Sequence, residues 1–182
     1  ISIDSATMMN KVFEIIEAKK IFNLPYNKLK ILIHPNSYVH AMIKFNNGMI
    51  KIIVHETSME IPIFNTLYQK NEKKFNTKKI DMKKLSFLDF AKVDFKRFPV
   101  VKIINFLPNK NSLFETVLVS ANDSLVNLFL KKKIEYNDIS KKLFKIVTSK
   151  EFARYKYIIP NKIKDINNLD KYVRFKINSL DI

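Results

Sequence analysis

The sequence predicts an α/β region that contains a β-hairpin, then a linker, and then an all-α C-terminal domain of four helices. Three observations predict this fold class. Apolar residues recur at helical spacing near the start of the chain. Two β-prone runs then flank the turn Asn46-Asn47-Gly48, which is typical of a hairpin. After Pro99, successive segments each carry one apolar helical face, and short helices of this kind pack into bundles.

The first expected element is an amphipathic helix over residues 6–22, because its apolar side chains follow the helical period. Asp4 and Ser5 precede it, and both are residue types that cap helix N-termini. The run over residues 29–35 is typical of a buried strand that stops at Pro35.

The hairpin is expected over residues 38–56, and Gly48, the single glycine of the chain, supplies the positive φ that its turn needs. Residues 66–97 are polar, lysine-rich and weakly periodic, so they predict a linker along the surface. The four helical segments are expected within residues 99–107, 112–132, 137–152 and 165–180.

The amount and the distribution of positive charge bear on whether the chain binds nucleic acid. The chain has 182 residues and a formal net charge of +16 at pH 7, which by itself favours a nucleic-acid partner. The charge is mostly lysine spread along the chain, whereas proteins that read phosphates cluster their charge and use arginine. We therefore expect no nucleic acid among the partners, with a basic nucleic-acid-binding module as an alternative.

The absence of cysteine excludes disulfides and thiolate metal sites. The apolar runs fall short of the roughly 20 residues that a membrane helix needs, so we expect no membrane partner. The chain begins without an initiator methionine or a leader, and we expect it to be the second part of a longer protein.

One short stretch near the start collects the polar side chains of Ser5, Asn10, Lys11, Glu14 and Glu17. On a helix that begins after Ser5, the amide and both carboxylates lie within about 60° of one face, with the ammonium beside them. Because free N–H groups at a helix start attract anions, the stretch predicts a phosphate cradle. Glu14 is then placed to bind Mg²⁺ or Mn²⁺, which prefer oxygen ligands. The alternative is a capped helix whose polar face is only solvated.

Several motifs follow one another in a specific order. They are DSATMMNK (4–11), the run from Glu14 to Gly48, MEIPI (59–63), DFKRFPVVK (94–102), SANDSLVNLFL (120–130) and YNDI (136–139). This ordered set resembles the 1-deoxy-D-xylulose 5-phosphate reductoisomerase family over most of the chain. The resemblance implies an NADPH- and divalent-metal-dependent oxidoreductase that rearranges and reduces this sugar phosphate to 2-C-methyl-D-erythritol 4-phosphate, in the non-mevalonate isoprenoid pathway.

The resemblance also assigns the site. It gives Ser5, Asn10 and Lys11 to the substrate phosphate, and Glu14 to the metal and the substrate oxygens. Glu14 and Lys11 are therefore the expected catalytic residues, and Mg²⁺ or Mn²⁺ the expected metal. Met59 is a candidate contact to NADPH. Phosphonohydroxamates of the fosmidomycin type are expected inhibitors, because they act on the family.

The family's architecture implies three parts. Residues 1–70 resemble the later part of a catalytic α/β domain with a mixed sheet, whose strands help to form a homodimer. Residues 71–98 resemble a linker, and residues 99–182 a helical bundle. One glycine cannot make the Gly-x-Gly-x-x-Gly fingerprint, so NADPH is expected to bind mainly to an upstream domain of the same protein.

Several further residues and functions were weighed against this family. His55-Glu56 starts like a zinc-protease motif, but Met59 stands where a second histidine is required, which excludes that function. For His34 and Ser37, lining the site and holding the loop both stay open, and we expect Asn122 to make a polar contact toward the active-site side. The AT-rich composition resembles apicomplexan proteins and implies a plastid, with the bacterial cytoplasm as the alternative. A non-catalytic homologue is the other functional alternative.

Overall fold

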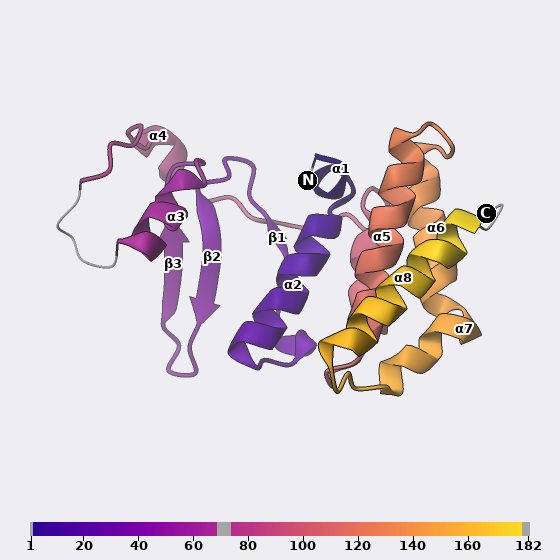
Figure 1. Cartoon of the computed structure of the whole chain (residues 1–182). Helices are drawn as coiled ribbons and strands as arrows, with labels where there is room; N and C mark the ends of the chain where they lie inside the picture. Colours follow the sequence, from indigo (N-terminus) through magenta and orange to yellow (C-terminus); the bar gives the residue numbers. More distant parts are fainter. Residues whose placement is uncertain (1, 69–73, 180–182) are drawn as a thin grey trace. The chain divides into compact units, whose positions relative to one another are not determined.

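The computed structural model describes residues 2–68 and 74–179, which divide into two compact units (Figure 1). The first unit joins the N-terminal residues up to Ile31 with the chain from Asp94 onward, and the second is Leu32–Val93. These divisions differ from the expected boundaries near residues 70 and 98. The physical reason is that the apolar face of the first long helix is part of the C-terminal helical core.

The first unit is helical. Its elements are α1 (Ser2–Thr7), α2 (Met9–Phe22), η1 (Tyr26–Lys28), η2 (Pro99–Phe106), α5 (Phe114–Leu130), α6 (Tyr136–Thr148), α7 (Lys150–Ala153), η3 (Arg154–Tyr157) and α8 (Ile163–Ser179). The expected helical segments after Pro99 are present, although the first, η2, is a 3₁₀ helix rather than an α-helix. Pro99 starts it, as expected, because its fixed φ and missing N–H suit a first helical turn.

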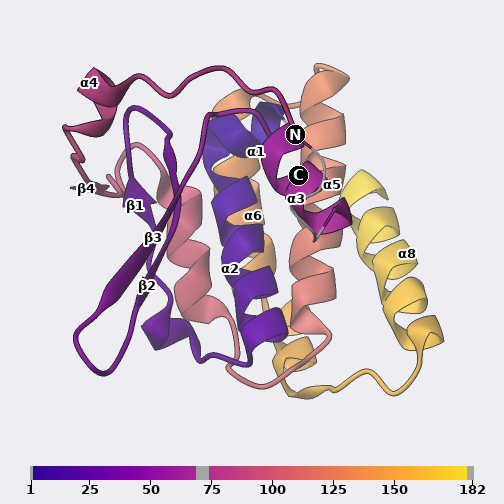
Figure 2. The same cartoon turned by 90° about the vertical axis from the view of Figure 1, so that its left-hand side faces the viewer.

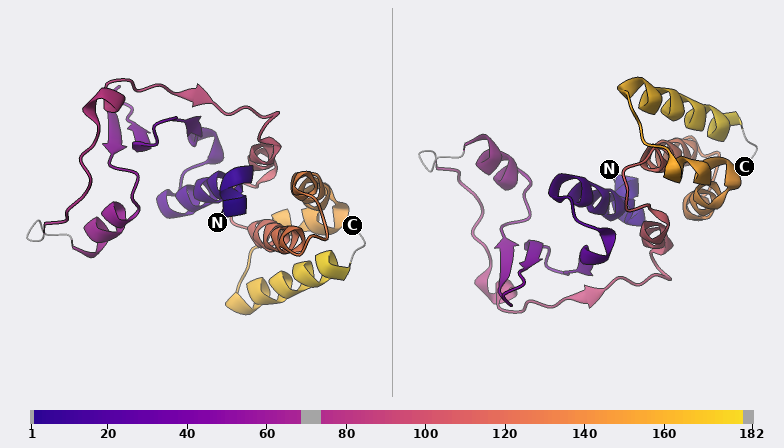
Figure 3. Two further views of the ribbon diagram at one scale, coloured as in Figure 1. Left: turned by 90° about the horizontal axis from the view of Figure 1, so that it is seen from above. Right: turned by 90° about the horizontal axis from the view of Figure 1, so that it is seen from below.

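The bundle is built around α5. Figure 3, which looks along the helices, shows α6 and α8 on different sides of α5, and both helices pack against it. The helix α2 joins the same core through η2. The largest fully buried side chains of this core are Met9, Ile103, Phe114, Leu118, Leu125, Ile139, Leu143 and Ile177. Close packing of such side chains fixes the position of α2, and therefore of the polar residues on its outer face.

The second unit contains the predicted hairpin, seen as two long paired strands in Figure 2. Strand β2 (Val39–Lys44) pairs antiparallel with β3 (Ile50–Val54), and the unit also contains β1 (Leu32–Ile33), α3 (Glu60–Leu67), α4 (Met82–Leu85) and β4 (Ala91–Lys92). Gly48 in the connecting turn has φ 86°, as predicted, and its N–H donates to the Phe45 carbonyl.

Three expectations about the second unit need correction. The expected mixed sheet is absent from the described residues. Both sheets there have two strands, and each pair is antiparallel. The strand predicted over 29–35 shortens to Leu32–Ile33, the residues that find partners in β4. The predicted linker is irregular for much of its described part, but it contributes α4 and β4, while residues 69–73 lie outside the described residues.

Candidate functional site

The expected single helix over residues 6–22 is interrupted at Met8. Helix α1 ends at Thr7, α2 begins at Met9, and Met8 between them has the left-handed conformation with φ 63°. The Thr7 hydroxyl oxygen accepts a hydrogen bond from the Met9 N–H at 3.3 Å. Ser5 therefore lies within α1 and does not cap α2, so the expected helix that begins after Ser5 is wrong, and the phosphate cradle stays a prediction.

The break has a packing reason. Thr7, Met8 and Met9 are all buried. Met9 belongs to the hydrophobic core of the bundle, whereas Thr7 and Met8 are buried outside that cluster. Left-handed backbone at a residue other than glycine costs roughly 1–2 kcal/mol, and the burial of these side chains offsets it.

Glu14 is the centre of a small polar cluster on the outer face of α2. The Asn10 amide donates to Glu14 Oε1 at 2.9 Å. The Lys11 ammonium donates to both Glu14 oxygens, at 2.9 and 2.8 Å. Residues three and four apart on a helix are neighbours, which is why this part of the site follows from sequence spacing alone. The structure thus brings together the amide, the ammonium and the carboxylate that were expected to act together.

Ser5 stands apart from this cluster. Its side chain is exposed on α1, and within the described residues no hydrogen bond joins it to Asn10 or Lys11. Glu17 is exposed one turn farther along α2. The Ser5 hydroxyl and the Lys11 ammonium both remain accessible to a ligand, because neither side chain is buried.

Glu14 is the only metal ligand that the sequence predicts in this chain. Within residues 2–68 and 74–179, no group of three or more His, Cys, Asp or Glu side chains could hold a metal ion. Magnesium takes about six oxygen ligands, of which an exposed carboxylate such as Glu14 is a suitable one. A divalent ion on Glu14 would therefore need further ligands besides this carboxylate.

The other residues considered from sequence lie in the second unit. Met59 is 64% exposed and directly precedes α3. His34 Nδ1 lies 3.0 Å from the carbonyl oxygen of Asp89, a contact that ties the loop after β1 to the segment leading into β4. Ser37 has φ 56° in the same loop. The contact with Asp89 favours a structural role for His34, holding the loop, over lining a site.

Sequence reasoning missed the partner of Asn122. Its Nδ2 donates to Asp4 Oδ1 at 2.7 Å, although the two residues are 118 positions apart. Asn122 is only 1% exposed. The one available signal was the amide itself, because an amide that becomes buried requires a polar partner.

A network of charges ties α5 to α8. Arg174 donates to Asp170 at 2.7 Å and to Asp123 at 2.9 Å, and the Ser120 hydroxyl donates to Asp170 at 2.7 Å. Burial alone would raise the pKa of Asp170, but the hydrogen bonds from Ser120 and Arg174 and the Arg174 charge outweigh it and lower that pKa. The network contains none of the expected site residues, and its role is to hold the bundle together.

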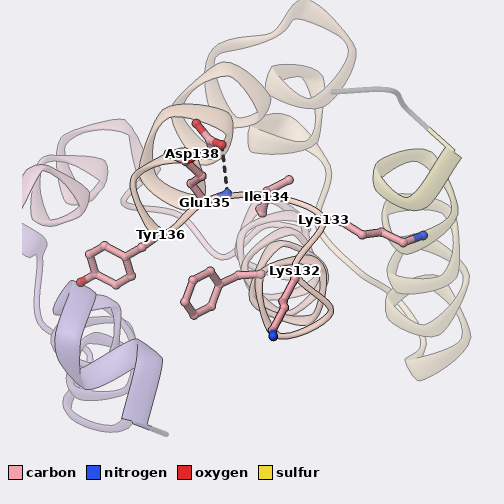
Figure 4. Close-up of a pocket in the computed structure, with 7 residues that line it drawn as sticks. Lys132, Lys133, Ile134, Glu135, Tyr136 and Asp138 are labelled. Carbon is pink, nitrogen blue, oxygen red and sulfur yellow. Dashed lines mark hydrogen bonds between the residues drawn. The ribbon is translucent and has the colours of Figure 1, made fainter.

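A pocket on the first unit lies apart from these residues. It has a volume of about 580 Å³ at the turn from α5 to α6 (Figure 4). It is lined by Phe129, Lys132, Lys133, Ile134, Glu135, Tyr136 and Asp138. The dashed bond in Figure 4 is donated by the Glu135 N–H to the Asp138 carboxylate at 3.1 Å, which caps the start of α6. This hollow contains no expected site residue.

Comparisons with known proteins converge on one family. A family model described as DXP reductoisomerase C-terminal domain matches residues 55–176, and one described as 1-deoxy-D-xylulose 5-phosphate reductoisomerase C-terminal domain matches residues 1–22. The chain is 58% identical, over all of its 182 residues, to 1-deoxy-D-xylulose 5-phosphate reductoisomerase of Pelagibacter ubique (strain HTCC1062), of which it covers 47%. It is 31% identical over 180 residues to the enzyme of that name from Proteus mirabilis (strain HI4320), covering 99% of this chain and 44% of the relative.

Solved structures of the same family resemble this chain. The reductoisomerase from Zymomonas mobilis in complex with NADPH superposes with a TM-score of 0.82 at 33% identity, over 98% of this chain and 46% of that one. A DOX-P reductoisomerase in complex with NADPH, fosmidomycin and magnesium superposes with a TM-score of 0.89 at 30% identity, over 98% and 45% of the two chains. The chain thus spans about half the length of the curated relatives that it matches.

Proposed function

Because the chain belongs to the 1-deoxy-D-xylulose 5-phosphate reductoisomerase family, we propose that the protein containing it converts this sugar phosphate to 2-C-methyl-D-erythritol 4-phosphate, using NADPH and Mg²⁺ or Mn²⁺. The reaction would open the non-mevalonate route to isoprenoids. The observation that carries the proposal is the contact of Asn10 and Lys11 with Glu14 on one accessible helix face. This chain would contribute the phosphate cradle and one metal ligand.

The phosphate would be held by three side chains. The Lys11 ammonium and the Asn10 amide are donors, and the exposed Ser5 hydroxyl supplies a further one. Hydrogen bonds from a charged donor to a phosphate are stronger than those between neutral groups. Gripping the phosphate, which does not react, fixes the carbon skeleton relative to the metal and the hydride donor.

Glu14 would act on the metal side of the site. When bound, a divalent ion polarises the ketone and the neighbouring hydroxyl and stabilises the negative charge that develops on oxygen. Glu14 would orient that ion and lie beside the substrate oxygens, while Lys11 turns from Glu14 to the phosphate. Lys11 and Glu14 are therefore the proposed catalytic residues of this chain.

NADPH would bind mainly to the upstream domain of the full-length protein. Structures similar to this chain contain NADPH and magnesium, which supports both cofactors here. Met59 is 64% exposed and offers an apolar, polarisable surface, so it stays the proposed contact of this chain with NADPH. The division into a catalytic segment (1–70), a linker (71–98) and a helical domain (99–182) stays a proposal about the full-length enzyme.

We also propose a homodimer formed with the help of the hairpin. Apolar side chains are exposed on both faces of β2 and β3, namely Met42, Ile43, Ile50, Ile52 and Ile53. A ribbon that leaves apolar groups in water on both faces needs cover from other protein. The second copy is the proposed cover for part of this surface.

The relatives named above are bacterial, which gives no support to the plastid expected from composition. We propose the alternative, the bacterial cytoplasm. No described helix is long and apolar enough to cross a bilayer. The nucleic-acid-binding alternative predicts binding that weakens steeply with salt, and the non-catalytic alternative predicts no turnover.

The test is NADPH oxidation by the full-length protein supplied with 1-deoxy-D-xylulose 5-phosphate. The protein is first treated with a chelator and then supplied with Mg²⁺ or Mn²⁺. Oxidation that requires both the sugar phosphate and the metal supports the proposal. Metal-loaded, folded protein that does not oxidise NADPH contradicts it and favours the non-catalytic homologue.

A further inference from the structure

Burying the amide of Asn122 costs folding free energy. The residue lies on α5, 1% exposed, and its Oδ1 has no hydrogen-bond partner among the described residues. An amide with an unsatisfied buried oxygen is less favourable than an apolar side chain of similar size. Its Nδ2, however, donates to Asp4 Oδ1 at 2.7 Å. The bond to Asp4 is therefore what this amide contributes to the fold.

Asp4 lies in a segment that needs such support. Helix α1 has six residues, and a helix of that length is not stable by itself in water. It continues into the left-handed Met8, whose N–H donates to the Ser5 carbonyl at 3.1 Å. The Thr7 hydroxyl bonds back to the Asp4 carbonyl at 3.3 Å. Asp4 is thus a polar point of attachment between this short segment and the helical bundle, beside the apolar contact of Ile3.

The exposed residue next to Asp4 is Ser5, the proposed phosphate donor on α1. We infer that Asn122 is a positioning residue: by holding the Asp4 carboxylate, it fixes α1 so that the Ser5 hydroxyl meets the substrate phosphate. The inference rests on the proposed phosphate cradle. It extends the site to a residue of the helical bundle that touches neither substrate nor cofactor.

The test uses the full-length protein and three variants. Asn122→Asp keeps the shape of the side chain but puts a carboxylate against the Asp4 carboxylate. Asn122→Leu keeps the approximate size and removes the donor. The exchanged pair Asp4→Asn with Asn122→Asp restores one donor facing one carboxylate in the opposite direction. Ser120→Ala is the matched control, because the buried Ser120 hydroxyl on α5 donates to Asp170 on α8 and not to α1.

We expect Asn122→Asp and Asn122→Leu to raise the KM for 1-deoxy-D-xylulose 5-phosphate by about tenfold, the effect of losing a hydrogen bond to a charged group. The KM for NADPH stays at the wild-type value. The exchanged pair returns the KM for the sugar phosphate to near the wild-type value. Ser120→Ala lowers the melting temperature without changing either KM.

Two outcomes overturn the inference. One is a KM for the sugar phosphate that stays unchanged in Asn122→Leu while the melting temperature falls. The other is a folded exchanged pair whose KM is no better than that of the single variants. If the wild-type protein does not turn over the sugar phosphate at all, the proposed reaction itself fails. Wild-type activity therefore separates failure of the proposed function from failure of this inference.

Discussion

The Lys11 ammonium lies 2.9 and 2.8 Å from the two carboxylate oxygens of Glu14, on neighbouring turns of α2. The two side chains are 50% and 47% exposed. An ion pair this open to solvent contributes little to stability, about 0–1 kcal/mol. Breaking it is therefore cheap, and a phosphate at Lys11 together with a metal ion at Glu14 would replace it with two stronger contacts.

The first prediction concerns this lysine. Lys11→Met in the full-length protein should raise the KM for 1-deoxy-D-xylulose 5-phosphate by about ten- to a hundredfold, because a hydrogen bond from a charged donor contributes roughly 1.5–3 kcal/mol. The KM for NADPH should not change. Lys28→Met, an exposed lysine on η1, is the matched control and should leave both constants alone. Equal kinetics in the two variants would remove Lys11 from the cradle.

The hairpin turn allows a test of backbone geometry. Gly48 has φ 86°, and an added Cβ would meet no atom within 4 Å. Gly48→Ala should therefore destabilise through the backbone alone, by about 1–2 kcal/mol, and Gly48→Asn by less. Thermal unfolding measures the difference. If the alanine variant melts at the wild-type temperature, the turn does not need its positive φ.

The charge network between α5 and α8 predicts that the free energy of unfolding depends on pH. The pKa of Asp170 is lowered from its ordinary 3.8, so its ionised form stabilises the folded state. That contribution is complete above the unfolded value and is lost as the pH falls through the folded one. Asp170→Asn should lower the free energy of unfolding by about 1 kcal/mol near neutral pH. The loss is small because the Arg174–Asp170 ion pair is partly exposed to solvent. Denaturant unfolding should show the difference in free energy between the two proteins shrinking as the pH falls below 3.8. A difference that does not depend on pH would mean that the ionised Asp170 carboxylate does not stabilise the folded state.

The exposed face of the hairpin predicts the oligomeric state. Ile53 on β3 is 49% exposed, and Ile53→Lys should weaken the proposed homodimer because it would bury an unpaired charge at the interface. Sedimentation velocity of the full-length protein should then show a shift toward monomer. Ile21→Lys, at an exposed isoleucine on α2, is the control and should stay dimeric. A dimer that persists in Ile53→Lys places the interface elsewhere.

Local signals carried most of the fold prediction. The Asn46-Asn47-Gly48 turn identified the hairpin, because few residues adopt its positive φ. The helical period of the apolar residues, which is also a local signal, identified α5, α6 and α8. The sheet partners were not predictable, since strand pairing depends on residues far apart in the chain. The pairing of Leu32–Ile33 with Ala91–Lys92 is one example.

The site was predicted only in part. Contacts within one helix follow from sequence spacing, whereas contacts between distant residues depend on the tertiary structure. Asn10, Lys11 and Glu14 share one helix face at spacings of three and four, so sequence alone brings them together. The left-handed turn at Met8 gave no sequence signal, because methionine does not favour that conformation and adopts it only under the demands of packing. The Asp4–Asn122 bond likewise required the tertiary structure.

The central claim is that Glu14 carries the metal side of the site. The most direct test is the turnover of the full-length protein in Glu14→Gln and Glu17→Gln, with Mg²⁺ or Mn²⁺ present at saturation. The two are exposed glutamates on α2 three positions apart, so each variant loses the same charge from the same helix. Glu14→Gln should lose about a hundredfold or more in kcat, as expected when a group that stabilises transition-state charge is removed, while Glu17→Gln should stay near wild type. Wild-type turnover in Glu14→Gln, or equal losses in both variants, would contradict this claim about Glu14.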